Sequence, residues 1–296
     1  RSTDFNLEQK EIPNDGVITG YGLIDGNPVY VFSQDSSALG GSVGEMHAKK
    51  ITRLYDLALK AKAPVIGLID SSGLRLQESS DALNGLGEIY AKQVMASGVI
   101  PQITAVFGNC GGGLAVMASL SDFSFMEENS SRLFLQTPNS LLGNHKQKLD
   151  TSGADFNAKS GNVDYVGANE LEVLNKIREL ISILPSNNEE GGRVSESSDN
   201  LNRLIPNFSS ELEDTKSALI DISDNYYFYE IKADYAKEMV TGFIRLNGVT
   251  VGAVANRTKI LDENGKATEQ FDNVLTTDGC KKAASFVRFC DAFNIP

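Results

Sequence analysis

The sequence predicts an α/β protein made of one complete βα repeat and the beginning of a second copy of that repeat. Three observations support this class. Residues 12–185 alternate strand and helix signals, two short apolar runs end in polar or glycine-rich turns as buried strands do, and segment 17–35 reappears as 239–257.

The repeated segment reads as a β-hairpin followed by a helix and a proline. Asp-Gly and Asn-Gly between alternating apolar runs favour a type I′ turn, because both residues tolerate positive φ. The matching pairs are Thr19-Gly20-Tyr21 with Thr241-Gly242-Phe243, Asp25-Gly26 with Asn247-Gly248, Ala48-Lys49-Lys50 with Cys280-Lys281-Lys282, and Ala63-Pro64 with Ile295-Pro296. The second copy stops before its own strand and loop, so we expect an incomplete form.

Apolar periodicity orders the remaining elements. Met46, Ile51, Leu54, Leu57 and Ala58 share one helical face, and Val65-Ile66-Gly67-Leu68-Ile69 has the run length of a buried strand. The expected elements are hairpin 17–35, helix 43–62, strand 65–70, helix 85–97, strand 103–107, helix 114–120, strands 123–126 and 133–135, and helix 170–183.

These elements divide the chain into three parts, of which residues 1–185 are expected to form the first repeat. Residues 186–236, rich in Asn, Glu, Ser, Gly and Asp, are expected to be a polar linker with a short helix near 215–220, and residues 237–296 begin the second repeat.

Composition excludes several classes of protein. A formal charge of -12 disfavours nucleic acid as a partner. Lys49, Lys50, Arg53, Lys60 and Lys62 form a basic group that could bind a polyanion, although a solvated helix face is the preferred interpretation. No apolar run has bilayer length and Arg1-Ser2-Thr3-Asp4 lacks a secretory pattern, so we expect a cytoplasmic protein. Arg1 in place of an initiator Met suggests trimmed ends.

Cysteine and histidine are scarce. Three scattered cysteines favour a reducing compartment and predict neither a disulfide framework nor a zinc site. Of the two histidines, His47 and His145, neither is placed by the sequence beside Ser71 or Ser72, which leaves a serine nucleophile without a partner. No metal is expected.

Two loops carry the signal for a ligand site, because each follows a strand that reads as buried. They are Asp70–Glu78 and Gly108–Gly113, and ligands gather at the carboxyl ends of such strands. Glycines before a helix let the backbone approach a ligand and point N–H groups at an oxyanion. A phosphate loop is disfavoured since Leu114-Ala115 follows the glycines; tight helix packing is the plain alternative. Cys110 reads as a buried small residue more readily than as a nucleophile.

Together with further segments, these loops resemble the carboxyltransferase subunits of biotin-dependent acyl-CoA carboxylases and decarboxylases, in the crotonase superfamily. The further segments are Val29–Asp35, Gly40–Lys50, Ser97–Gln102, Leu184–Asn188 and Phe289–Pro296. The resemblance implies a crotonase-like ββα spiral, with one full repeat plus the start of a second. The first repeat would hold acyl-CoA and the second biotin, and the site would form between repeats of different subunits.

The resemblance also implies the site residues. Backbone N–H groups of Gly112, Gly113 and Leu74 would form an oxyanion hole for a thioester enolate. The ureido group of biotin would take the α-proton, so no side-chain base is required, and Val116 stands where crotonase-type hydratases place an acid/base Glu. Further contacts to the substrate are expected from Gly41, Ser42, Gly73, Arg75, Cys110 and Gly111.

Two departures from the family pattern bear on the substrate. Leu74 and Leu114 stand where the family usually has alanine, so a short acyl chain is expected. Expected partners are the acyl-CoA, a biotin carboxyl carrier protein or domain, biotin carboxylase or membrane decarboxylase subunits, and further copies of this chain, with biotin arriving on another protein. Two alternatives stay open: a biotin-independent crotonase-type thioester enzyme, and an acyl-CoA-binding or assembly protein without full activity.

Overall fold

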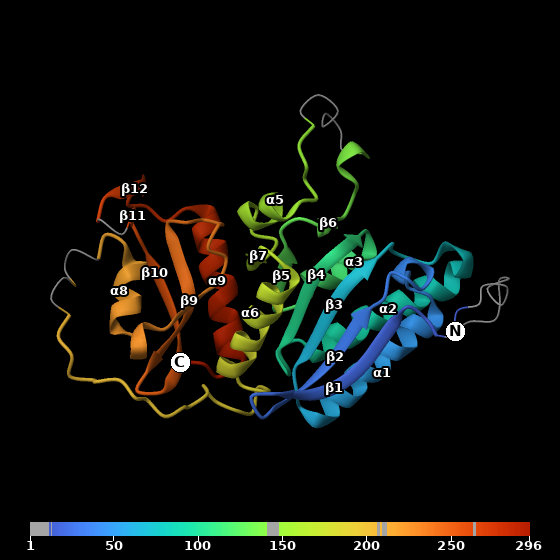
Figure 1. Cartoon of the computed structure of the whole chain (residues 1–296), viewed down its shortest axis with the longest axis horizontal. Helices are drawn as coiled ribbons and strands as arrows, with labels where there is room; N and C mark the ends of the chain where they lie inside the picture. Colours follow the sequence, from blue (N-terminus) through green and yellow to red (C-terminus); the bar gives the residue numbers. More distant parts are fainter. Residues whose placement is uncertain (1–11, 13, 141–147, 206–207, 209–211, 263–264) are drawn as a thin grey trace. The chain divides into compact units, whose positions relative to one another are not determined.

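A computed structural model describes residues 12, 14–140, 148–205, 208, 212–262 and 265–296 (Figure 1). The chain divides into two compact units, residues 1–182 and residues 183–296. Among the residues that the structure describes, no helix has both the length and the apolar character that a bilayer crossing requires.

The first unit is built on one mostly parallel sheet. Its strand order is β1-β2-β3-β4-β5-β7, and β6 pairs with the carboxyl end of β4. Only the pair β1 and β2 is antiparallel, as expected for a hairpin. The strands are β1 (Val17–Ile24), β2 (Asn27–Gln34), β3 (Val65–Ser71), β4 (Gln102–Gly111), β5 (Phe123–Glu127), β6 (Arg132–Phe134) and β7 (Tyr165–Gly167).

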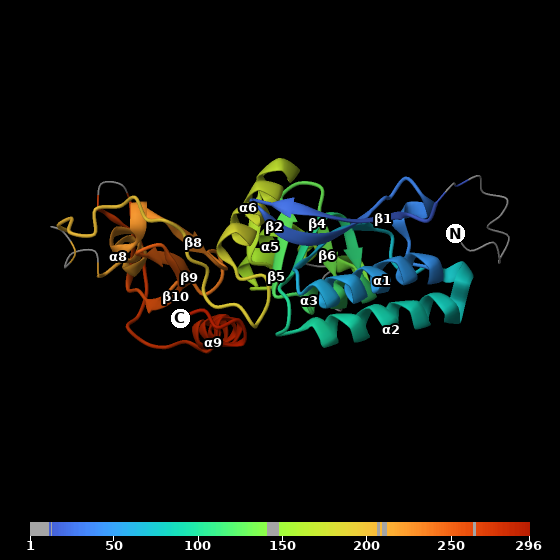
Figure 2. The ribbon, with the colours of Figure 1, turned by 90° about the horizontal axis from the view of Figure 1, so that it is seen from below.

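Helices α1 (Glu45–Ala61) and α2 (Ser79–Ala96) lie side by side along one face of this sheet (Figure 2). Their contact is close, since a Cβ at Gly85 would lie 2.7 Å from Ala48 Cβ. Ile51, Leu54, Ile89 and Ile69 belong to the buried core between helices and sheet. The shorter helices are α3 (Gly113–Ser119) and α5 (Ala154–Lys159), and α6 (Glu170–Ile183) ends the unit.

The second unit holds a three-stranded antiparallel sheet. Its order is β10-β9-β8, formed by β8 (Phe228–Glu230), β9 (Met239–Leu246) and β10 (Val249–Asn256). Helix α9 (Thr277–Ala292) packs on β9 through Phe243, whose ring centroid lies 5.0 Å from that of Phe286 and 6.3 Å from that of Phe289. Helix α8 (Thr215–Ile222) and the pair β11 (Lys259–Leu261) and β12 (Ala267–Gln270) complete the unit.

The duplication read from the sequence is present in the backbone. Val17 pairs with Gln34 in the first hairpin, and Met239 pairs with Asn256 at the equivalent place in the second. The two copies of the helix also end alike, since Lys62 and Asn294 have φ of 53° and 51°. The N–H that follows each of them returns to the helix, over 3.1 Å from Ala63 to Ala58 O and 2.9 Å from Ile295 to Cys290 O.

One lysine plays a similar part in each copy. Lys50 Nζ donates to Val17 O, and Lys282 Nζ donates to Tyr235 O at 2.8 Å, so each ammonium group ties its helix to the chain where the hairpin starts. The matching lysines Lys50 and Lys282 thus both bond to a backbone carbonyl near the hairpin, although Val17 and Tyr235 are not equivalent positions.

Residues 186–236 differ from the expected polar linker, because they contribute α8 and β8 to the second unit. Their polar side chains bond to the backbone of the second hairpin and the strands after it. Asp224 accepts from the N–H groups of Asn247 at 3.0 Å and Gly248 at 2.6 Å, and Asp214 accepts from Leu261 N–H at 3.0 Å. The polar composition predicts a solvated linker, whereas Asp214 and Asp224 are buried acceptors of backbone hydrogen bonds.

Candidate functional site

The sheet brings the two expected loops together. β3 and β4 run parallel, with Ser71 beside Cys110, so their carboxyl ends lie at the same edge. The segment before α1 joins them, since Val43 N–H donates to Gly73 O at 2.9 Å and Arg75 N–H donates to Val43 O at 2.9 Å. Three segments far apart in sequence therefore meet at one place.

The glycine run is more ordered than the predicted loop. β4 continues through Gly111, because Asn109, Cys110 and Gly111 pair with β6. The turn is confined to Gly112, whose φ of 59° and ψ of -124° suit glycine alone. A Cβ at Gly112 would meet nothing within 4 Å, so this bend faces open space, whereas one at Gly108 would lie 1.9 Å from Asp70 Oδ1.

Of the three amides expected to form the oxyanion hole, two are unengaged. The bridge between Val43 and Leu74 uses the N–H of Arg75 and the carbonyl of Gly73, which leaves Leu74 N–H directed away from Val43. Gly113 opens α3, where an N–H has no intrahelical acceptor. Within the described ranges, neither amide has a hydrogen bond to the protein.

Gly112 requires a correction. Its N–H donates to Phe134 O at 2.9 Å, which extends the ladder between β4 and β6. The sequence pattern counted consecutive glycines as equivalent donors, but pairing with β6 consumes this one. The available donors are therefore Leu74 and Gly113.

Gly113 is held by α2. Tyr90 Oη donates to Gly113 O at 2.5 Å. A Cβ at Gly113 would lie 2.5 Å from Leu86 Cδ2, so glycine is needed here for close packing. Both explanations of the glycine run, ligand approach and tight packing, thus apply to Gly113, whose N–H is available and whose missing Cβ makes room for Leu86.

Arg75 and Ser42 were expected to contact substrate, but their polar groups bind each other. The Arg75 side chain is 2% exposed. Its Nε donates to Ser42 Oγ at 3.1 Å and its Nη2 to Ser42 O at 2.6 Å. The same guanidinium reaches Asp15 Oδ2 at 3.0 Å and Glu78 Oε1 at 2.8 Å through Nη1, and Asp15 Oδ1 at 2.5 Å through Nη2.

His47 completes this buried group. Its Nδ1 lies 3.7 Å from Asp15 Oδ1, and its Nε2 lies 3.2 Å from Gln34 Nε2. Burial lowers the pKa of His47 despite the neighbouring carboxylate. Burial acts to raise the pKa of Asp15, but the nearby His47 and the hydrogen bonds from Arg75 outweigh it and hold that pKa well below its usual range. His47 therefore has no contact with Ser71, whose hydroxyl donates to Gly41 O at 2.7 Å; His145 lies outside the described residues.

Three further expected substrate contacts serve packing instead. Cys110 is fully buried, and burial raises the pKa of its thiol to about 12. A Cβ at Gly41 would lie 2.3 Å from Asp70 O, and one at Gly111 would lie 2.7 Å from the Phe134 ring. Gly73 alone of the remaining contacts faces open space, with φ of 101° and no heavy atom within 4 Å of a Cβ there.

A hollow of about 290 Å³ opens beside Leu74. Of the two leucines that replace the family's alanine, Leu74 lines this hollow, whereas Leu114 belongs to the buried core. The lining residues are Leu39, Ser42, Ser72, Leu74, Arg75, Leu76 and Gln77.

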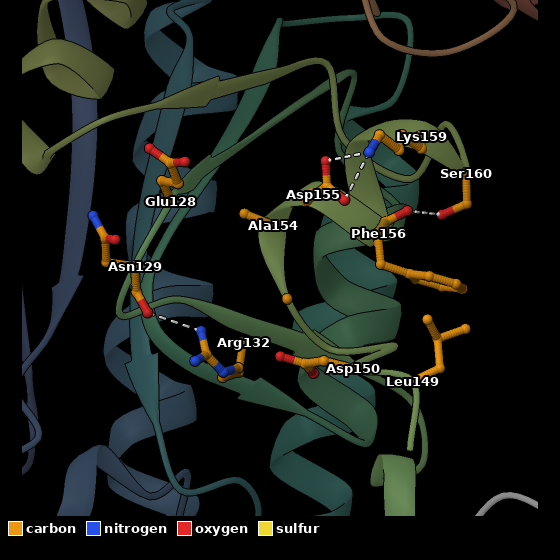
Figure 3. A pocket seen from close by; sticks show the side chains of 11 residues that line it. Glu128, Asn129, Arg132, Leu149, Asp150, Ala154, Asp155, Phe156, Lys159 and Ser160 are labelled. Carbon is orange, nitrogen blue, oxygen red and sulfur yellow. Dashed lines mark hydrogen bonds and ion pairs between the residues drawn. The ribbon is translucent and has the colours of Figure 1, made fainter. Parts of the chain in front are cut away.

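A larger hollow, of about 690 Å³, was not foreseen from the sequence (Figure 3). Figure 3 shows Glu128 and Asn129 on one side of it and the ion pair of Asp155 with Lys159 on the other. Arg132 Nη1 donates to Asn129 O at 3.0 Å at its rim. Its lining comes from α5, β6 and short loops, which carry no apolar periodicity to mark them. Across the described part of the chain, no group of three or more His, Cys, Asp or Glu side chains could hold a metal ion.

The profile of the carboxyl transferase domain matches residues 1–296. The chain belongs to this family. It is 41% identical over 307 residues to the propionyl-CoA carboxylase beta chain of Roseobacter denitrificans, covering 100% of this chain and 58% of that protein. It is 40% identical to the methylmalonyl-CoA decarboxylase subunit alpha of Veillonella parvula, with the same coverage.

Solved structures agree. Transcarboxylase 12S, in a hexamer with hydrolysed methylmalonyl-coenzyme A bound, matches with a TM-score of 0.86 at 32% identity, over 100% of this chain and 58% of that one. The fold is the crotonase-like fold of these carboxyltransferases, so the family and fold class expected from the sequence are confirmed. The chain spans 58% of the length of the first relatives it matches.

Proposed function

We propose that this chain provides the acyl-CoA side of a carboxyltransferase, which moves a carboxyl group between biotin on a carrier protein and the α-carbon of a short acyl-CoA. The observation that carries the proposal is the pair of unengaged amides, Leu74 N–H and Gly113 N–H, at the ends of two adjacent parallel strands. Preorganised donors of this kind stabilise a thioester enolate, and removing one costs roughly 3 to 4 kcal/mol of transition-state stabilisation.

Neither His47 nor Val116 can serve as the catalytic base, so the proton acceptor would come from another molecule. His47 is fully buried and Val116 is apolar, so neither can act as a base at the thioester α-carbon. Biotin would supply the carboxyl group and the ureido nitrogen that takes the α-proton. The chain's own amides would hold the thioester oxygen while charge builds on it.

A short acyl group fits the hollow beside Leu74, whose volume is about 290 Å³. The relatives named for propionyl-CoA and methylmalonyl-CoA support the same size of substrate. We assign residues 1–185 to the acyl-CoA repeat and residues 237–296 to the start of the biotin repeat. The proposed partners are a biotin carrier, biotin carboxylase or membrane decarboxylase subunits, and further copies of the chain. The proposed location is the cytoplasm.

The test follows labelled carboxyl transfer from methylmalonyl-CoA to a biotinylated carrier protein, using the full-length protein that contains this chain, while calorimetry follows propionyl-CoA binding to the 296-residue chain. We expect binding by the chain and transfer that avidin blocks. Acyl-CoA turnover that continues without biotin would replace the proposal with a biotin-independent thioester enzyme. Binding without transfer by the full-length protein would favour an assembly protein.

A further inference from the structure

We infer that the buried ion network of Arg75, Asp15, Glu78 and Ser42 positions Leu74 N–H as an oxyanion donor. The inference rests on the proposed function, since it assigns a task to residues behind that site. Arg75 is a positioning residue, because its guanidinium binds protein groups and acts on the thioester only through the neighbouring amide of Leu74.

The network clamps the two segments that fix Leu74. On one side Arg75 holds Ser42 through both the carbonyl, at 2.6 Å, and the hydroxyl, at 3.1 Å. On the other side it holds Glu78 at 2.8 Å, and Glu78 Oε2 accepts from Glu45 N–H at 2.6 Å. The bridge between Val43 and Leu74 therefore lies inside a frame of charge-assisted hydrogen bonds, which are stronger than neutral ones.

Asp15 anchors the frame to the hairpin. It accepts from Arg75 with both oxygens, and its Oδ1 also accepts from Gly16 N–H at 2.9 Å. A lysine could keep the charge of Arg75 but could not reproduce this fork, because an ammonium group has no fixed planar geometry.

The second copy of the fold shows that the hairpin and helix do not need this network. Lys237 stands at the position equivalent to Asp15, and Gly279 stands at the position equivalent to His47. The hairpin register and the helix end are nevertheless the same in both copies. A buried ion pair is weak evidence for a gain in stability. In the second copy Lys237 stands where Asp15 stands in the first, so a carboxylate at this position is not a requirement of the hairpin and helix.

Such support matters because an oxyanion donor works by being in place before charge develops. Donors that must reorganise during the reaction lose much of their effect, and small displacements of a catalytic group are costly. Leu74 N–H sits on an isolated bridge, not within a long strand, so its direction depends on the residues on either side.

The experiment measures the carbonyl stretch of propionyl-CoA, labelled with ¹³C at the thioester carbon, by isotope-edited infrared spectroscopy on the 296-residue chain. Hydrogen bonds to the thioester oxygen lower this frequency. We expect a downshift on binding to the unaltered chain and loss of at least half of it in Arg75→Lys, with Kd changed by no more than about threefold.

Arg257→Lys is the matched control. Arg257 is also a buried arginine, 6% exposed and 3.2 Å from Asp214, but it belongs to the second unit. Its replacement should reduce stability while leaving the carbonyl band in place. If Arg75→Lys does not fold, Glu78→Gln is measured, since it keeps the shape and removes one charge of the frame.

The outcomes distinguish failure of the proposed oxyanion hole from failure of the positioning role of the ion network. No downshift with the unaltered chain would overturn the proposed oxyanion hole itself. A downshift that persists in full in a folded Arg75→Lys or Glu78→Gln chain would overturn the positioning role alone. A downshift lost equally in Arg257→Lys would assign the effect to general stability and would also overturn it.

Discussion

The copy formed by β1, β2 and α1 and the copy formed by β9, β10 and α9 share the hairpin register and the helix end, but they differ in their surroundings. Tyr21 on β1 is 82% exposed, whereas the equivalent Phe243 on β9 is fully buried. β8 pairs with β9, while β1 ends its sheet. The common features are those that a hairpin and a helix need, and the differences lie in what each copy is joined to.

The ion network is the sharpest of these differences, and Asp15→Asn tests it. We expect a loss of about 3 to 5 kcal/mol in the free energy of unfolding, because Arg75 would keep a buried charge with a weakened partner. Lys237→Asn, at the equivalent position, should change it by no more than about 0.5 kcal/mol, since Lys237 is 34% exposed in its pair with Glu269. Denaturant unfolding at neutral pH measures both.

The stability that Asp15 contributes should depend on pH in a known direction. The pKa of Asp15 is held below its usual range in the folded chain, so its contribution is present above the unfolded pKa, near 3.8, and is lost as pH falls below it. The gap between the unaltered chain and Asp15→Asn should therefore shrink in acid. Equal losses for Asp15→Asn and Lys237→Asn would mean that the two copies share this stabilisation.

Lys282 on α9 offers a second test, because it is buried and burial lowers its pKa to about 8 from 10.5. Between these two values the unfolded chain binds more protons than the folded chain, so stability rises with pH. We expect the unaltered chain to gain up to about 3 kcal/mol relative to Lys282→Met from pH 8 to pH 10.5. Thermal unfolding across this range measures the gap, and a gap that stays constant would show that Lys282 titrates normally.

The features shared by the two copies are also those that the sequence predicted well. Asp25-Gly26 and Asn247-Gly248 specify their turns locally, and apolar spacing specifies α1, so both hairpins and this helix lie where expected. Local patterns suffice where neighbouring residues decide the conformation.

The site was predicted less completely, because its details depend on distant partners. Gly112 loses its N–H to Phe134 O through pairing with β6, a strand of three residues. Arg75 is turned inward by Asp15, which lies 60 positions earlier in the chain. A motif names the loop that carries the chemistry, but which amide in it is free depends on pairing that local sequence does not encode.

The turns themselves separate local from tertiary effects. Gly26 and Gly248 have φ of 81° and 80°, so alanine is strained equally in both. A Cβ at Gly26 meets nothing within 4 Å, but one at Gly248 would lie 1.8 Å from Ser195 O. We expect Gly26→Ala to cost about 1 kcal/mol and Gly248→Ala about 2 to 3 kcal/mol, measured by denaturant unfolding. Equal costs would show that the segment around Ser195 moves aside freely.

The smallest effect is expected at Cys280, whose position on α9 matches Ala48 on α1. Ala48 is fully buried against α2, whereas Cys280 is exposed. Exchanging the residue types should therefore give unequal results: about 1 to 2 kcal/mol lost for Ala48→Cys, and less than about 0.5 kcal/mol for Cys280→Ala.

Thiol labelling of the native chain checks the same contrast. Cys280 should react readily, while Cys110 and Cys290 should be protected, because burial raises the pKa of each of these two thiols to about 12. Protection of Cys280 in the 296-residue chain would mean that this face of α9 is covered in solution. The helix would then be covered at this position in both copies, as α1 is covered by α2 at Ala48.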